Sequence, residues 1–121
     1  MHTKPNPVPT PGCLCTANDP DFMEYRYAEH IPYCRHSLTF ALQATVFNRY
    51  NIRLADRNKY EIDYLIPTAC GLSNSLDNLW PQPIAEAAEK NKLEDILYRL
   101  LQAGSISQAE IVREIYNWFD R

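Results

Sequence analysis

The spacing of apolar residues along the chain predicts three helices. The first is expected to begin at about Ser37, as its N-cap, and to run for roughly four turns. The second follows Pro83 and ends at Gly104, a natural helix stop. Ser107 and Glu110 have the S-x-x-E spacing of a capping box, which predicts the start of a last helix. The expected apolar faces are Leu38, Ala41, Leu42, Thr45, Val46 and Tyr50, then Leu93, Ile96, Leu97, Leu100 and Leu101, then Ile111, Ile115, Trp118 and Phe119.

Two short runs are rich in residues that favour strands. YEIDYLIP, residues 60–67, alternates in part and ends at Pro67. After several turn-forming residues, a second short strand is expected around Leu79 and Trp80. Between Cys13 and Cys34 there is no helical periodicity, so an irregular segment is expected there. Its aromatic side chains are expected to pack over the core: Phe22, Tyr25, Tyr27 and Tyr33.

The first twelve residues differ in composition from the rest. KPNPVPTPG, residues 4–12, has four prolines in nine residues, which favours polyproline II or disorder. Residues 1–12 are therefore predicted to be a flexible tether and residues 13–121 a single α+β domain. A chain of 121 residues with 45% hydrophobic residues is long enough for one such core.

The net charge of the chain argues against nucleic acid as a partner. Twelve Lys and Arg stand against fifteen Asp and Glu, giving a formal charge of −3, whereas proteins that bind phosphate backbones usually have a basic surface. A local phosphate-binding face remains open, because Arg26, Arg35, Arg49, Arg53 and Arg57 lie in one half of the chain. No run approaches the roughly eighteen apolar residues of a membrane span, so no transmembrane segment is expected.

Four cysteines form an even set in a small protein. None of them is in a C-x-x-C pair, so disulfides are favoured over a zinc site or free thiols. Of the three pairings, we expect Cys15 with Cys34, which closes the irregular segment, and Cys13 with Cys70, which ties that segment to the turn after the first strand. Disulfides indicate a secreted or periplasmic protein, here in a mature form after leader removal.

The stretch YEIDYLIPTACGLSNSLDNLWPQ, residues 60–82, resembles the bacterial HNH endonuclease-like (ββα-metal, His-Me finger) pattern of the form Y-x-I-D-H-L-I-P followed by S-N-x-x-x-N-L-W-P-Q. Upstream, the CT-x-x-DPDF and YRY-x-x-x-I-x-YCR stretches look like small exported members of that superfamily. The resemblance implies a ββα-metal core with a short β-hairpin, an N-terminal helix and two C-terminal helices, stabilised by disulfides.

The same resemblance assigns roles to individual positions. Asp63 falls on the acid that can bind a divalent metal, and Asn78 on the Asn that braces the loop. Tyr64 occupies the place of the general-base histidine, and Pro83 stands about where a further histidine is often found. A phenol with a pKa near ~10 stays protonated at neutral pH, where an imidazole near ~6.5 can accept a proton. At the two positions closest to the chemistry, Tyr64 and Pro83, the sequence thus differs from the family pattern.

Each of these residues also has an ordinary structural interpretation. Asp63 is either a residual metal ligand or an acceptor of hydrogen bonds from the turn that follows it. Tyr64 is either an altered catalytic group or a side chain that fills the space of the histidine. His30 and His36 flank Cys34 and are either replacement metal ligands or surface and capping residues. Trp80 is expected to be a core anchor rather than a stacking platform.

The functional expectation is a catalytically degenerate, exported binding or interaction module with no cofactor, whose partner is a protein, a nucleic acid or an envelope component. The alternative is a metal-dependent endonuclease that hydrolyses phosphodiesters with a rearranged site of Asp63, Asn78 and His30 or His36. A third interpretation is a purely structural or inhibitory partner of another protein. The fold itself does not choose among them.

Overall fold

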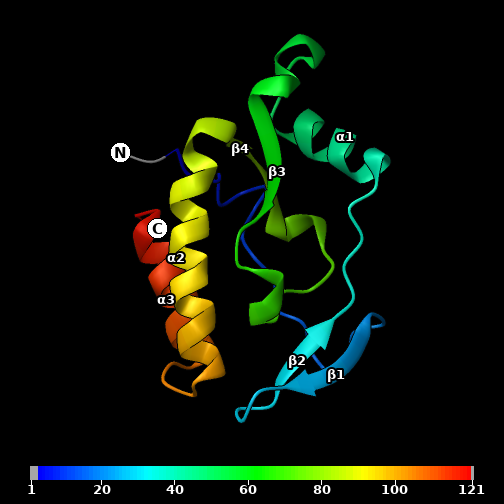
Figure 1. Ribbon diagram of the computed structural model, residues 1–121. Coiled ribbons are helices and arrows are strands. Elements are labelled where there is room, and N and C mark those ends of the chain that lie inside the picture. Colours follow the sequence, from blue (N-terminus) through cyan, green and yellow to red (C-terminus); the bar gives the residue numbers. More distant parts are fainter. Residues whose placement is uncertain (1–2, 121) are drawn as a thin grey trace.

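The structure of the protein is a computed structural model that describes residues 3–120. It is a mixed α+β fold, as the sequence predicted, and within those residues it has three α-helices and two antiparallel β-hairpins, one more hairpin than expected. The hairpins lie apart in space, with the helices packed around the second one (Figure 1). In chain order the helices and strands are β1 (Phe22–Arg26), β2 (Ile31–Cys34), α1 (Phe40–Arg49), β3 (Tyr60–Tyr64), β4 (Leu79–Pro83), α2 (Ile84–Gln102) and α3 (Gln108–Trp118).

The predicted second hairpin is confirmed as β3 paired with β4, from Tyr60 opposite Pro83 to Tyr64 opposite Leu79. Beyond the strands, the Leu65 N–H donates to the Asn78 carbonyl at 2.7 Å. In an antiparallel ladder hydrogen-bonded pairs alternate, so the two prolines of β4 fall at positions whose nitrogen points away from β3. The ladder is therefore complete despite prolines in the strand.

The two C-terminal helices complete the core beside this hairpin. α2 runs alongside β3 and β4, and α3 lies against α2 (Figure 1). The capping box at Ser107 and Glu110 is confirmed, with each side chain accepting from the other residue's backbone N–H. Trp80 is a core anchor, since it is 1% exposed and meets the Phe119 ring edge to face at 5.4 Å. The core cluster comprises Ile31, Leu65, Ile66, Cys70, Leu72, Trp80, Leu97, Leu101, Ile111, Ile115 and Phe119.

The first helix starts later than predicted. Its N-cap is Thr39, whose side chain accepts from the Leu42 N–H at 3.1 Å, and not Ser37. The buried face consists of Val46 and Phe47. The expected apolar face is therefore partly wrong, because Ala41 and Thr45 are exposed.

The segment predicted to be irregular contains the β1–β2 hairpin. Arg26 pairs with Ile31, and the four-residue connection between them has two residues with positive φ, Tyr27 at 66° and His30 at 58°. Such turns usually contain Gly or Asn, so this one gives no sequence signal. Of the aromatic residues expected over the core, Tyr27 packs against it, but Tyr25 is 53% exposed.

Residues 3–12, predicted to belong to the tether, lie against the folded domain. Residues 6–10, which include Pro7 and Pro9, form a compact turn closed by the Thr10 N–H, which donates to the Asn6 carbonyl at 2.9 Å. Thr10 is fully buried. Residues 1–2 lie outside the described part of the chain, and the domain boundary after residue 12 stays a prediction.

Candidate functional site

Asp63, the candidate metal ligand, lies near the end of β3 directly opposite Trp80. Its Oδ2 atom accepts from Lys90 Nζ at 2.6 Å and from Trp80 Nε1 at 3.2 Å. The side chain is 15% exposed. Asp63 is thus a hydrogen-bond acceptor, as one of the two interpretations expected. However, its two donors come from β4 and α2 and not from the turn that follows.

Lys90 is the centre of this site. It is 0% exposed, and Nζ donates to three oxygens: Asp63 Oδ2, the Tyr64 carbonyl at 2.8 Å and Glu94 Oε2 at 2.9 Å. All three hydrogens of an ammonium are then used. Burial raises the pKa of the Glu94 carboxyl, although the nearby Lys90 charge partly offsets this. Strand and helix are therefore joined by a cation held between two carboxylates and a carbonyl.

Lys90 and Glu94 are not among the site residues predicted above, although the chain contains a signal for both. The inward face of α2 follows three-and-four spacing, and two of its positions carry charged residues. A lysine and a glutamate inside a stripe of apolar positions indicate a buried ion pair. The stripe is Ala87, Lys90, Glu94, Leu97 and Leu101.

Tyr64, at the general-base position, is half-buried on the last residue of β3. Burial raises the pKa of its phenol above 10.0, which makes it a still weaker base. The His36 ring meets the Tyr64 ring edge to face at a centroid distance of 5.4 Å, and Tyr33 lies on the other side at 6.1 Å. The structure therefore brings one of the two candidate histidines beside Tyr64.

The His36 ring is in an unusual environment. Both ring nitrogens are buried, and neither makes a hydrogen bond of good geometry within residues 3–120. Burial lowers the pKa of His36, while the nearby backbone of Leu72 and Cys34 and the charges of Asp21 and Asp19 oppose that shift. The neutral imidazole is thus favoured. His30, in contrast, lies exposed in the β1–β2 turn, with Tyr25 at 6.2 Å, and is not brought to Asp63 by any described contact.

Asn78, the candidate bracing residue, is completely buried at the end of the loop between β3 and β4. Its Nδ2 donates to the Ser73 carbonyl and to the Cys13 carbonyl, both at 2.9 Å, and Oδ1 accepts from the Cys13 N–H. These bonds tie the loop to the N-terminal part of the domain. Its family role stays a prediction.

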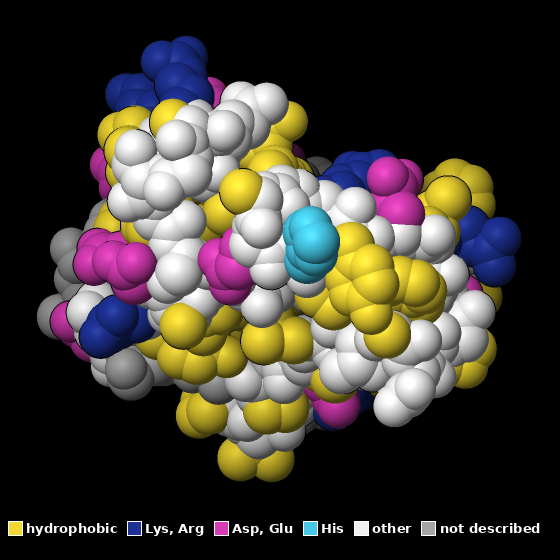
Figure 2. Space-filling view, turned by 90° about the horizontal axis from the view of Figure 1, so that it is seen from below, with side chains coloured by type: hydrophobic (Ala, Val, Ile, Leu, Met, Phe, Trp, Pro, Cys, Tyr) yellow, Lys and Arg dark blue, Asp and Glu magenta, His cyan; other side chains and the backbone are white. Residues whose placement is uncertain are grey.

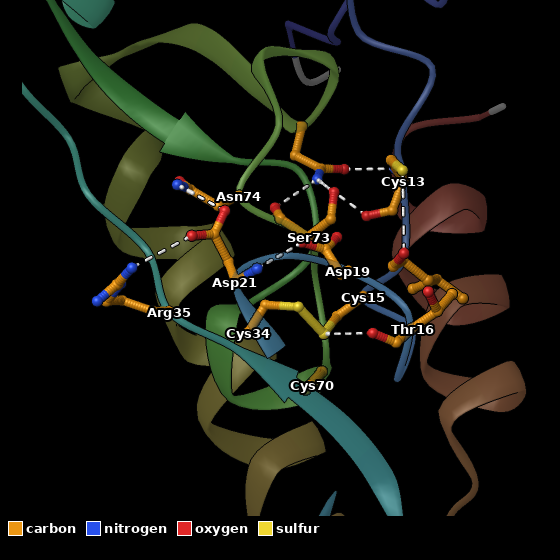
Figure 3. The surroundings of a disulfide bond; sticks show 12 residues. Cys13, Cys15, Thr16, Asp19, Asp21, Cys34, Arg35, Cys70, Ser73 and Asn74 are labelled. Carbon is orange, nitrogen blue, oxygen red and sulfur yellow. Dashed lines mark hydrogen bonds and ion pairs between the residues drawn. A yellow bond between two sulfur atoms is a disulfide. The ribbon is translucent and has the colours of Figure 1, made fainter. Parts of the chain in front are cut away.

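The Cys15–Cys34 disulfide is confirmed, with a Cα–Cα distance of 5.7 Å (Figure 3). The expected Cys13–Cys70 bridge is absent, since both residues are free cysteines. Cys70 is part of the core, and burial raises the pKa of its thiol to about 12. Cys13 is exposed, and its backbone is held by Asn78, well away from Cys70 in Figure 3.

The five candidate phosphate-binding arginines are all engaged by other side chains. The Arg26 guanidinium stacks 3.5 Å from the Tyr33 ring centroid and pairs with Glu24. Arg57 donates to Asn48 Oδ1 at 2.8 Å. The remaining three contact carboxylates, in the pairs Arg35 with Asp21, Arg49 with Asp77 and Arg53 with Asp56. A phosphate at most of these positions would lie close to a carboxylate.

The site residues do not fit a divalent ion. The Lys90 ammonium beside Asp63 Oδ2 would repel a divalent cation, and Tyr64 and Pro83 supply no metal-binding nitrogen. Within residues 3–120, no group of three His, Cys, Asp or Glu side chains is placed to hold a metal ion. In the same part of the chain, no helix is long and apolar enough to cross a bilayer.

Comparison of the chain with protein-family models, with curated proteins and with solved structures gave no match.

Proposed function

We propose that this chain is an exported, HNH-like (ββα-metal) protein that has lost nuclease chemistry and acts as a binding module for another protein. Two features support the assignment: the sequence motif of residues 60–82, and the chain order of β3, β4 and α2, in which the helix follows the hairpin directly. The Cys15–Cys34 disulfide supports an oxidising compartment, secreted or periplasmic.

The observation that carries the proposal is the buried Lys90 ammonium on Asp63. A catalytic metal must bind a water molecule and lower its pKa, which needs an ion with an open coordination position. An ammonium has neither property, since it only donates hydrogen bonds. Lys90 therefore neutralises Asp63, and this supports the proposed loss of the chemistry that the family motif implies. Tyr64, with its raised pKa, gives no alternative base.

A protein partner is favoured over nucleic acid. The chain has a formal charge of −3, and the arginines are engaged as described. The end of the molecule that carries the β1–β2 hairpin shows hydrophobic side chains at its surface (Figure 2). In this hairpin, Met23 is 56% and Tyr25 53% exposed, and the Phe22 ring lies 5.1 Å from the Tyr25 ring. Exposed aromatic residues and methionine are typical of protein interfaces.

The experiment is a cleavage assay on plasmid DNA and on RNA with Mg²⁺, Mn²⁺, Ni²⁺ or Zn²⁺, run beside Asp63→Ala. We expect no cleavage above background for either protein. In parallel, calorimetric titration of the unmodified chain with Mn²⁺ is expected to show no site. Metal-dependent cleavage that disappears in Asp63→Ala would overturn the proposal.

One observation favours the alternative endonuclease: the neutral His36 ring lies beside Tyr64, where the family has its base. If His36 activates water, cleavage must be present in the unmodified chain and lost in His36→Ala. His30→Ala is the matched control, because that residue is exposed in the β1–β2 turn. Activity that survives in His36→Ala would exclude this rearranged site.

A further inference from the structure

The proline-rich arm, residues 3–12, is docked with the backbone donors of residues 5–12 satisfied. Prolines alternate with other residues from position 5 to position 12, and proline has no N–H. Each of the four remaining N–H groups donates a hydrogen bond. The bonds are Asn6 N to Tyr50 Oη at 3.0 Å, Val8 N to Asn6 Oδ1 at 2.9 Å, Thr10 N to the Asn6 carbonyl at 2.9 Å, and Gly12 N to the Asp77 carbonyl at 3.0 Å.

A series of linked hydrogen bonds holds the arm at its buried threonine, Thr10. The Thr10 hydroxyl donates to the Leu79 carbonyl at 2.9 Å and lies 2.6 Å from the Tyr50 hydroxyl, which accepts from the Asn6 N–H. Because the Thr10 hydrogen is used on Leu79, Tyr50 is the donor in the middle bond. From α3, the Tyr116 hydroxyl donates to the Pro11 carbonyl at 3.0 Å. We call the surface formed by Tyr50, Asp77, Leu79 and Tyr116 the arm groove.

The arm is well suited to bind as a separate ligand. Its four prolines restrict φ, and two of its bonds are internal to the Asn6 turn, so little conformational freedom is lost on docking. It belongs to no sheet, and it is joined to the domain only through Gly12, at φ 91°. The contacts that hold the arm would be the same if it came from another chain, as in domain-swapped dimers.

We propose that the arm groove is a recognition site for this proline-rich sequence and that a second copy of the chain can fill it, giving a reciprocal arm-exchanged dimer. In one chain the arm has a high effective concentration at its own groove, so the exchanged form gains only at high protein concentration. The inference does not depend on the loss of nuclease chemistry.

The first test uses the full chain and a fluorescent peptide of residues 3–12. Thr10→Asp puts a charge at the fully buried position and releases the arm, whereas Val8→Asp changes a residue that is 84% exposed. We expect Thr10→Asp to bind the peptide at least tenfold more tightly than Val8→Asp, whose own arm competes. A scrambled peptide should not bind.

Tyr50→Phe in the Thr10→Asp background should weaken peptide binding about fivefold, because it removes one hydrogen bond of the chain. Gly12→Ala provides a second release variant, since a Cβ there would lie 2.5 Å from the Tyr116 hydroxyl. No saturable binding to either variant, with near-ultraviolet circular dichroism confirming the fold, would overturn the recognition site. Equal binding of the scrambled peptide would do the same.

The second test is light scattering after the unmodified chain has been held at millimolar concentration and then diluted. We expect a dimer fraction that decays slowly and that is absent in Thr10→Asp. A purely monomeric unmodified chain, or an equal dimer fraction in Thr10→Asp, would overturn the exchange.

Discussion

Lys90 shows how much one side chain decides in this protein. Removing an ammonium and two carboxylates from water costs several kcal/mol per ion, and the cost is offset only where geometry is good and every hydrogen is bonded. Lys90 meets this condition with three oxygens between 2.6 and 2.9 Å. Loss of the ammonium leaves two carboxylates facing each other, which is the costlier state.

We therefore expect Lys90→Met to lower the free energy of unfolding by about 3–5 kcal/mol, measured by urea denaturation. Methionine retains an unbranched apolar side chain but cannot neutralise Asp63 or Glu94. Lys92→Met is the matched control, because Lys92 is exposed on the same helix, and we expect a change within about 0.5 kcal/mol. Equal losses in both variants would show that the bonds of Lys90 contribute nothing specific.

His36 predicts a pH dependence of stability. Burial lowers its pKa from the ordinary value of 6.5, so as the pH falls the unfolded chain takes up the proton before the folded one. The stability contributed by neutral His36 is fully present above about pH 6.5 and is lost as the pH falls through the lowered pKa.

His36→Phe keeps an aromatic ring between Tyr33 and Tyr64 but cannot take up a proton. Between about pH 7.5 and 5.5 it should lose less stability than the unmodified chain, as measured by urea unfolding at each pH. His30→Phe should follow the unmodified chain. A pH dependence that is unchanged in His36→Phe would exclude His36 as its source.

At the scale of elements, the sequence predicted the helices and strands that are determined by residues close together in the chain. The capping box gave the start of α3, and the alternation of residues 60–67 gave β3, because both depend on neighbours in the chain. The β1–β2 hairpin was missed because its turn uses positive φ at Tyr27 and His30, which tertiary contacts impose: the Tyr27 hydroxyl donates to the Ala69 carbonyl at 2.8 Å. The charged positions in the apolar stripe of α2 were a local signal for Lys90, but its partner Asp63, 27 residues away, could not be read from neighbours in the chain.

Ser107→Ala tests the cap of α3. It removes the acceptor for the Glu110 N–H and should cost about 1 kcal/mol, seen as a lower midpoint of thermal unfolding. Ser105→Ala, outside the helix and exposed, should leave the midpoint unchanged. If the two variants melt together, the capping box does not stabilise the protein.

At the scale of the whole molecule, a disulfide ties the end of the β1–β2 hairpin to the segment that precedes it. Cys15 and Cys34 are 19 residues apart in the sequence, and a loop of that size gains about 3 kcal/mol from closure. Cys15→Ala/Cys34→Ala should lose about that much stability, measured by urea unfolding without reductant. Cys13→Ala, at an exposed free cysteine, is the control and should change little.

The prolines of β4 have a consequence for assembly. Pro81 and Pro83 lie opposite Ile62 and Tyr60, at positions whose nitrogens face outward from the hairpin. The outer edge of β4 therefore lacks an N–H donor at Pro81 and at Pro83, so a strand from another molecule could not pair with the edge at these two positions. With donors missing at two positions, the outer edge of β4 is a poor template for the backbone pairing by which fibrils grow.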